Sequence, residues 1–151
     1  MSAIYDVKNN LIFTGGHDGT LLAWHFETGF IKFYLHEMDP TCCSKKYIHD
    51  AKSVDSLAIM NKSRILLSAT ADQTIRFWDL TDLSSGKQPI FKMKVNHAEG
   101  DALTMIAVNI DCDRLVTTDT AGRMKLWDIS KADFRNEKSD PLSKIREMWF
   151  I

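Results

Sequence analysis

The chain has 151 residues, of which 44% are hydrophobic and 26% are charged, a balance typical of a globular protein and not of a disordered one. Its 19 basic and 20 acidic residues give a formal net charge of −1, and there is no basic stripe, so a nucleic-acid partner is not expected. Three cysteines without a disulfide spacing, no secretory signal and no apolar run near the roughly 20 residues of a membrane helix predict a cytoplasmic protein without a membrane partner.

The first unit, residues 1–34, consists of short apolar runs separated by turn residues. β-Branched and aromatic residues in these runs fit a pleated surface, and the glycines within residues 15–19 suit the positive-φ positions of a hairpin turn. The unit therefore predicts four antiparallel strands, at residues 3–5, 11–14, 20–25 and 30–34.

A polar insertion at residues 35–53 follows, and its Asp39-Pro40 pair disfavours both helix and central strand. The second unit, residues 54–95, predicts strands at 54–59, 65–69, 75–78 and 90–95. The third unit, residues 96–151, predicts strands at 102–109, 114–118, 124–128 and 145–151, with a long loop at 129–144. A short helix is considered only for residues 131–137.

One stretch of sequence occurs three times, at residues 11–24, 66–79 and 115–128. Each copy contains two apolar runs around a tight turn and reaches a tryptophan, at Trp24, Trp78 and Trp127. Self-similarity of this kind is the signature of a repeat protein. The second and third strands are apolar at nearly consecutive positions, whereas a half-exposed sheet alternates, so we expect sheets covered on both faces, as in blades stacked around an axis.

Two of the three copies close with the dipeptide Trp-Asp after a tight turn, a pattern that resembles the WD40 repeat family. The closing dipeptides are Trp78-Asp79, Trp127-Asp128 and the degenerate Trp24-His25. The resemblance covers essentially the whole chain and implies an all-β fold, a β-propeller of WD40 type with about three four-stranded antiparallel blades. Because propellers typically have about four to eight blades, the resemblance implies a partial propeller, and we expect two apolar sheet faces to be uncovered.

Blades of this family contain a hydrogen-bond network that joins a Trp, a strand Ser or Thr, a His and an Asp. A buried indole N–H needs an acceptor, and a neutral imidazole both donates and accepts. By position, the resemblance assigns His49, Ser68, Asp72 and Trp78 to the second repeat, His97, Thr117 and Trp127 to the third, and Thr14, Asp18 and Trp24 to the first. Ala121 stands where the third Asp is expected, so that network is predicted to be incomplete. We expect these residues to stabilise the fold.

The uncovered faces predict partners: other proteins, or further blades of the same propeller in cis or in trans. The insertion at 35–53 mixes aromatic, Met and Cys residues, and the end of the chain is apolar for an outer strand, so both are candidate contact regions. The candidate contact residues are Asp39, Cys42, Tyr47, Trp149 and Phe150. The alternative explanation, that long surface loops are neutral insertions of low entropic cost, stays open beside this one.

No catalytic pattern is present. The Gly-rich turn at 15–19 has the wrong spacing for a dinucleotide site, and residues 85–88 lack the full phosphate-loop pattern, so neither an enzyme nor a small-molecule substrate is expected. A zinc site would use His36, Cys42, Cys43 and His49, but no Cys-x-x-Cys spacing supports it, so we expect no metal or other cofactor.

The resemblance favours a non-enzymatic protein–protein interaction scaffold, part of a larger assembly. Within the family, the insertion and residues 52–55 and 71–78 are similar to the large WD-repeat proteins of cilia and flagella, which implies an axonemal complex of the cytoskeleton. The alternative is a peptide-recognising adaptor in a ubiquitin ligase or signalling complex, which a basic or aromatic pocket at the central channel would favour.

Overall fold

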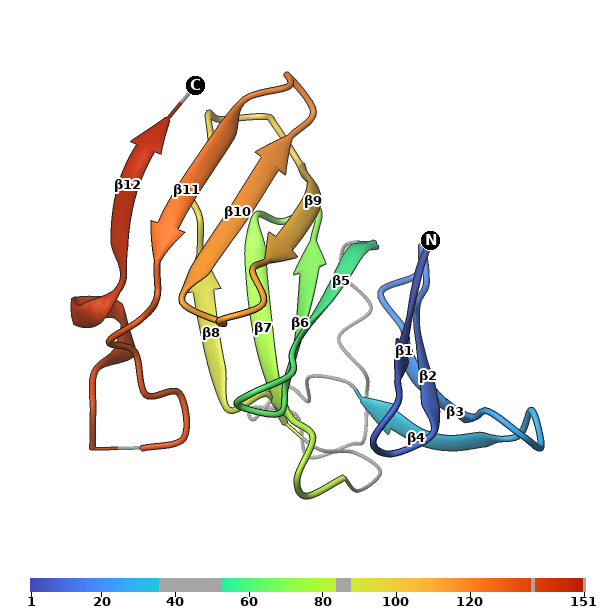
Figure 1. The fold of residues 1–151 in the computed structure, drawn as a ribbon. Coiled ribbons are helices and arrows are strands. Elements are labelled where there is room, and N and C mark those ends of the chain that lie inside the picture. The colour runs from blue at the N-terminus through green and yellow to red at the C-terminus, as the bar shows by residue number, and fades with distance from the viewer. Residues whose placement is uncertain (36–52, 84–87, 137, 151) are drawn as a thin grey trace, which may run out of the picture.

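The computed structural model describes residues 1–35, 53–83, 88–136 and 138–150, and for Trp149 and Phe150 the course of the backbone alone. The described residues form three four-stranded antiparallel sheets, called blades 1 to 3, which follow one another along the chain (Figure 1). Blade 1 contains β1 (Ser2–Asp6), β2 (Leu11–Gly15), β3 (Leu21–His25) and β4 (Ile31–Leu35). Blade 2 contains β5 (Val54–Met60), β6 (Ile65–Thr70), β7 (Thr74–Asp79) and β8 (Phe91–Lys94). Blade 3 contains β9 (Leu103–Val108), β10 (Arg114–Asp119), β11 (Met124–Asp128) and β12 (Arg146–Phe150).

The first two hairpin turns of every blade contain a residue with positive φ, a backbone conformation that matches tight hairpins to the twist of their strands. In the first hairpins these residues are Asn10, Arg64 and Cys112, and in the second hairpins Gly19, Gln73 and Gly122. Only two of the six are glycine. The backbone therefore repeats more closely than the sequence does.

Side chains alternate between the two faces of each blade, and we name the faces by chain order. The forward face points to the next blade in the sequence, and the backward face points to the preceding one. Strand registers make Phe13, Leu67 and Val116 equivalent forward positions, and Ile12, Leu66 and Leu115 equivalent backward positions.

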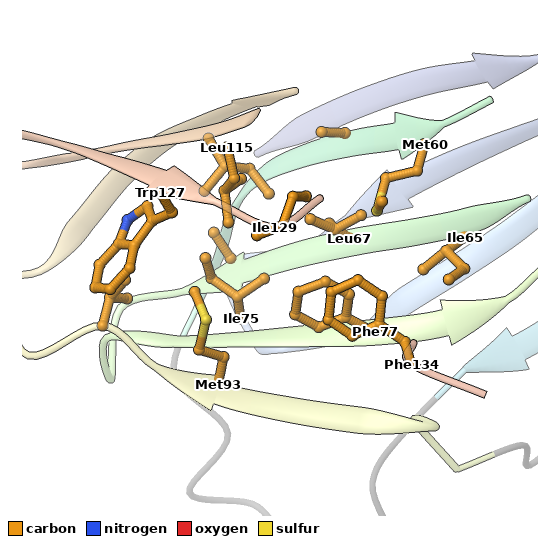
Figure 2. Packing of buried hydrophobic residues seen from close by; sticks show 14 of the residues in the cluster. Met60, Ile65, Leu67, Ile75, Phe77, Met93, Leu115, Trp127, Ile129 and Phe134 are labelled. Atoms are coloured by element: carbon orange, nitrogen blue, oxygen red, sulfur yellow. The ribbon is translucent and has the colours of Figure 1, made fainter. Parts of the chain in front are cut away.

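Two hydrophobic cores lie between the blades. The first joins forward residues of blade 1, such as Phe13, to Leu66 and Trp78 on the backward face of blade 2. The second joins Leu67 and other forward residues of blade 2 to the backward face of blade 3 (Figure 2). Blade 2 is thus covered on both faces, and every residue of β6 is buried.

The outer blades are covered on one face only by the described chain. Strands β2 and β10 alternate between buried and half-buried residues, and so does β11. Coverage on both faces is therefore found for blade 2. Each outer blade has one face whose apolar side chains have no cover within the described residues, as expected of a partial propeller.

The all-β expectation is confirmed, with small differences at the boundaries. Leu35 is the buried last residue of β4 and not part of the insertion. Residues 131–136 form no helix, and a single short 3₁₀ helix, η1 (Pro141–Lys144), lies in the loop before β12. Within the described ranges, no helix has the length and apolarity to cross a membrane.

Candidate functional site

Blade 3 contains a continuous hydrogen-bond network that is buried against blade 2. His97, in the segment leading to β9, places Nδ1 3.0 Å from Asp119 Oδ2 and Nε2 3.0 Å from Thr117 Oγ1. Trp127 Nε1 donates to the same Thr117 oxygen at 3.0 Å. The network therefore ties the segment that enters the blade to its two central strands.

Donor and acceptor chemistry assigns a direction to every bond in this network. A carboxylate only accepts, so Nδ1 of His97 carries the hydrogen; in the neutral ring Nε2 then accepts from the Thr117 hydroxyl, and that oxygen accepts from Trp127. The imidazole is neutral in this arrangement. Burial lowers the pKa of His97 and outweighs the opposing charge of Asp119, so the surroundings favour the same neutral form.

The predicted gap in this network is wrong. Ala121 does stand in the turn, but Asp119, two residues earlier, supplies the carboxylate from inside the strand. Asp119 also accepts from the backbone N–H groups of Ala121 and Arg123 and from Arg123 Nε, so it holds the following turn as well. A signal was present, because Thr117 and Asp119 are two apart in a strand and share its buried face.

Blade 2 contains the corresponding Trp–Ser pair. Trp78 Nε1 donates to Ser68 Oγ at 2.9 Å, and both residues are buried. The fourth predicted member, His49, lies outside the described residues, so its link to this pair stays a prediction.

Asp72 lies in the turn between β6 and β7, where it accepts from the Thr70 hydroxyl and from the backbone N–H of Thr74. Arg76 Nη2 is 3.4 Å from its other oxygen. Burial alone would raise the pKa of Asp72, but the Thr70 hydrogen bond and the Arg76 charge outweigh it and hold the pKa below its ordinary value. Asp72 is therefore a charged residue that stabilises its own turn.

Blade 1 keeps only the Trp–Thr pair. Trp24 Nε1 donates to Thr14 Oγ1 at 2.7 Å. Asp18 is exposed and accepts from the backbone and hydroxyl of Thr20, two residues later. The structure therefore does not bring Asp18 to Thr14 and Trp24, because the turn folds its carboxylate outward onto Thr20.

The Asp of each Trp-Asp pair stabilises the next connection. Asp79 Oδ1 accepts from the backbone N–H and hydroxyl of Thr81, and Asp128 Oδ1 accepts from those of Ser130. His25 takes this place in blade 1, and its Nδ1 is buried with no hydrogen-bond partner in the described chain. The degenerate Trp24-His25 pair therefore has no carboxylate to stabilise the connection that follows β3.

An ion pair joins blades 1 and 2. Arg64 Nη1 and Nη2 donate to the two carboxylate oxygens of Asp6 at 2.9 and 2.7 Å, and the side chains are 12% and 1% exposed. Asn9 donates to Asp6 and to the Leu80 carbonyl oxygen. Burial would raise the pKa of Asp6, but the hydrogen bonds and charge of Arg64 hold it below its ordinary value.

The loop between β11 and β12 folds back on blade 2. The ring of Phe134 stacks on Phe77 with centroids 4.4 Å apart, and Figure 2 shows the two rings side by side. Arg135 donates to both oxygens of Asp79 and to the Arg64 carbonyl oxygen. These hydrogen bonds hold the pKa of Asp79 well below its usual range. This part of the loop therefore makes contacts within the chain. An isolated Phe in a charged segment was the only sequence signal for them.

The backward face of blade 1 has no cover in the described chain. It carries several large apolar or aromatic residues: Tyr5 and Tyr34 are 43% and 51% exposed, and Ile12, Leu22 and Trp24 are half-buried. Beside this face, at the blade edge, Phe26 packs on Tyr5 with ring centroids 4.9 Å apart and is 54% exposed. This face is the first candidate interaction surface.

The forward face of blade 3 is the second candidate interaction surface. Met105 is 60% exposed and Ala107 is exposed, while Val116, Met124 and Leu126 are half-buried. The register pairs Leu126 with Trp149 and Lys125 with Phe150, which places these two predicted contact residues along the outer edge of the blade.

The other predicted contacts, Asp39, Cys42 and Tyr47, lie outside the described residues. So do the four side chains weighed for zinc, His36, Cys42, Cys43 and His49. Among the residues that are described, no group of three or more His, Cys, Asp or Glu side chains is placed to hold a metal ion.

Comparison with known proteins supports the blade architecture. Residues 41–79 match the model of the WD40 family, described as WD domain, G-beta repeat. No curated protein matches the chain. Among solved structures, the β-propeller domain of Cps50 (Swd1) from Myceliophteria thermophila matches with a TM-score of 0.59 and 19% identity, over 85% of this chain and 35% of that one. The chain thus has the fold of part of a WD40-type propeller and spans about a third of that relative's length.

Proposed function

We propose that this chain supplies three consecutive blades of a non-enzymatic protein–protein interaction scaffold. One observation carries the proposal. In the described chain, the backward face of blade 1 and the forward face of blade 3 are apolar and uncovered, whereas the equivalent faces between the blades are buried. Val116, for example, is half-buried, whereas the equivalent Leu67 is 0% exposed. Large uncovered apolar faces mark interaction surfaces. The partners are further blades of the same propeller, in cis or in trans, or other proteins.

A hydrophobic dye tests whether the two faces are open surfaces. The chain is expected to bind a dye whose fluorescence rises in apolar surroundings, and Val116→Ser with Leu126→Ser should reduce the signal. Leu142→Ser is the matched control, because Leu142 is 53% exposed but lies in η1, outside both faces. A monomeric chain that binds no dye contradicts the proposal.

The insertion at 36–52 is proposed as a partner contact because it mixes aromatic, Met and Cys residues. Its exchange for a Gly-Ser linker of equal length should abolish capture of a partner, as should combined Asp39→Ala, Cys42→Ser and Tyr47→Ala substitutions. Retained capture after either change would leave the insertion a spacer. Trp149→Ala with Phe150→Ala tests the edge of blade 3 in the same assay.

One cavity is a candidate peptide site for the adaptor alternative, although it lies among turns and a loop and not at the central channel. It has a volume of about 300 Å³ and lies between the β5–β6 turn, the β9–β10 turn and the loop after β11. Met60, Ile65 and Phe134 give it apolar walls, and Lys62 and Asp111 pair at its edge. A Met60→Trp substitution that fills the cavity should abolish peptide binding if the chain is an adaptor, and leave partner capture unchanged if it is a scaffold.

The cytoplasmic and axonemal locations are proposed from the sequence resemblance to ciliary WD-repeat proteins. Fluorescence microscopy of the tagged protein in ciliated cells tests them. Signal along the axoneme is expected, and a signal absent from cilia contradicts the axonemal proposal.

A further inference from the structure

The cavity between blades 2 and 3 lies where the second core reaches the surface, beside the β5–β6 and β9–β10 turns. Its apolar walls are core residues, since Met60, Ile65, Ile129 and Phe134 are at most 6% exposed (Figure 2). The cavity therefore gives access to packed apolar surface at an interface that the chain itself forms. Its walls do not depend on what covers the outer blades.

The size of the cavity limits the class of ligand. Pockets for small molecules and cofactors commonly have volumes of roughly 300–1,000 Å³, and this one, at about 300 Å³, is at the lower end of that range. The cavity therefore suits a single apolar side chain better than a dinucleotide or another large cofactor.

The charged residues around the cavity leave one carboxylate without a cation. Lys62 Nζ pairs with Asp111 Oδ1 at 2.6 Å between the two turns, and Arg135 is bound to Asp79. Asp133 is exposed, accepts the backbone N–H of Arg135, and has no ion pair within the described ranges. The entrance therefore has one uncompensated negative charge, which favours a cation next to the apolar group that enters.

One polar atom of the wall also lacks a partner. Ser63 lines the cavity, and its Oγ is buried without a hydrogen bond in the described chain. Buried polar groups normally have a partner. A peptide carries backbone N–H and C=O groups next to each side chain, and these are the groups that a hydroxyl can bind. This favours a peptide over a simple hydrocarbon.

We propose that this cavity binds one apolar side chain of a partner peptide, with a lysine or arginine of that peptide beside Asp133. The inference rests on the adaptor alternative of the proposed function and deepens it, because it names the motif that the adaptor recognises. It does not use the two open faces. A failure of the dye experiment would therefore leave it standing, and its own failure would leave the scaffold standing.

Reversible disulfide exchange at Cys112 tests the cavity, because Cys112 is half-buried and lines it. Cys42→Ser with Cys43→Ser leaves this residue as the single thiol of the chain. The protein is equilibrated with β-mercaptoethanol and a phenylethyl thiol, and intact-protein mass spectrometry gives the ratio of phenylethyl to hydroxyethyl adduct. In the control, Lys8→Cys with Cys112→Ser moves the thiol to the exposed β1–β2 turn, outside the cavity.

The adduct ratio at Cys112 should exceed the control ratio by about tenfold or more, since burial of one aromatic ring has at least that effect on an equilibrium constant. Met60→Trp and Ala132→Phe fill the cavity from two sides and should each lower the ratio to the control value. Circular dichroism checks that both variants keep their strands.

An aminomethyl group on the phenyl ring tests the role of Asp133. The cationic ring should be captured about twofold to fivefold better than the plain one, as expected of an exposed charge pair. Asp133→Asn should remove this preference and leave capture of the plain ring unchanged.

Four results overturn the inference. They are equal adduct ratios at Cys112 and at Lys8→Cys, a ring preference that both filling variants leave unchanged, a preference for the cationic ring that survives Asp133→Asn, and a ratio that rises when the insertion at 36–52 is exchanged for a Gly-Ser linker. The last result would mean that the insertion, and not a partner, occupies the cavity.

Discussion

Blade 2 and the two blades beside it have the same order of strands but differ in how many of their faces are buried. All six residues of β6 are buried, whereas β2 and β10, its counterparts, alternate with half-buried positions. Blade 2 has a neighbour on each face, and each outer blade has one. In a repeat protein, stability is approximately a sum of repeat and nearest-neighbour terms, so the same side chain carries a different energetic weight in each blade.

The largest expected difference is in the free energy of unfolding lost when the tryptophan of blade 2 or of blade 1 is replaced by alanine. Trp78→Ala should lower the free energy of unfolding by about 3–5 kcal/mol, because the side chain is buried and its loss leaves Ser68 unpaired. Trp24→Ala should cost about half as much, because that side chain is only half-buried. Urea unfolding of dilute samples measures both, and a Trp78 loss below about 1 kcal/mol would contradict the core assignment.

The ion pair between blades 1 and 2 gives the next largest effect. Arg64→Met leaves the Asp6 carboxylate buried without its partner, which should cost about 3 kcal/mol. Lys62→Met is the matched control on the same turn, because Lys62 and Asp111 are 62% and 65% exposed and should contribute nothing measurable. Equal melting temperatures for the two variants would show that the Arg64–Asp6 pair does not stabilise the contact between blades 1 and 2.

Equivalent forward residues offer a third comparison. Leu67→Ala should cost about 2 kcal/mol or more, because the cavity forms between two blades. Val116→Ala, at the same place in blade 3, should cost less than about 1 kcal/mol in a dilute monomer. A Val116 loss as large as that of Leu67 would mean that blade 3 is covered.

The smallest effect is a pH dependence of blade 3. Because the pKa of His97 is lowered in the folded chain, the unfolded chain takes up a proton first as the pH falls below the ordinary value of 6.5. Stability should therefore be full above that pH and decrease on acidification, by at most about 1.4 kcal/mol per pH unit for one proton. Asp119, Arg123 and Lys125 all act on this imidazole.

Urea unfolding between pH ~8 and ~5 measures this dependence. His97→Gln should flatten it, since the amide does not titrate. An unchanged slope in that variant would assign the effect to another group.

The order of the strands was predictable because it depends on local patterns. Apolar runs and turn residues locate the strands of all three blades to within one residue at each end. Alternation and sequence order alone also explain why Ser68 meets Trp78 and Thr14 meets Trp24, since each pair lies on adjacent strands of one hairpin.

Contacts between blades were not predictable, because they depend on how separate repeats pack. Arg64 meets Asp6 across 58 positions in sequence, and Arg135 meets Asp79 across 56. Nothing in their local pattern identifies the partner. The Asp119 carboxylate was missed for a different reason: the family's turn position was weighed above the strand face that Thr117 and Asp119 share.

Gly15 limits how freely these repeats can be exchanged. A Cβ atom at this position would clash with Val54 Cγ1, so blade 1 approaches blade 2 more closely than a side chain allows. Strand registers place Ala69 and Thr118 at the equivalent positions of the other blades. Because the permitted spacing differs at each junction, an order that places the third unit before the second would bring Thr118 against Val54. The repeats are therefore matched neighbours and not interchangeable modules for recombination or design.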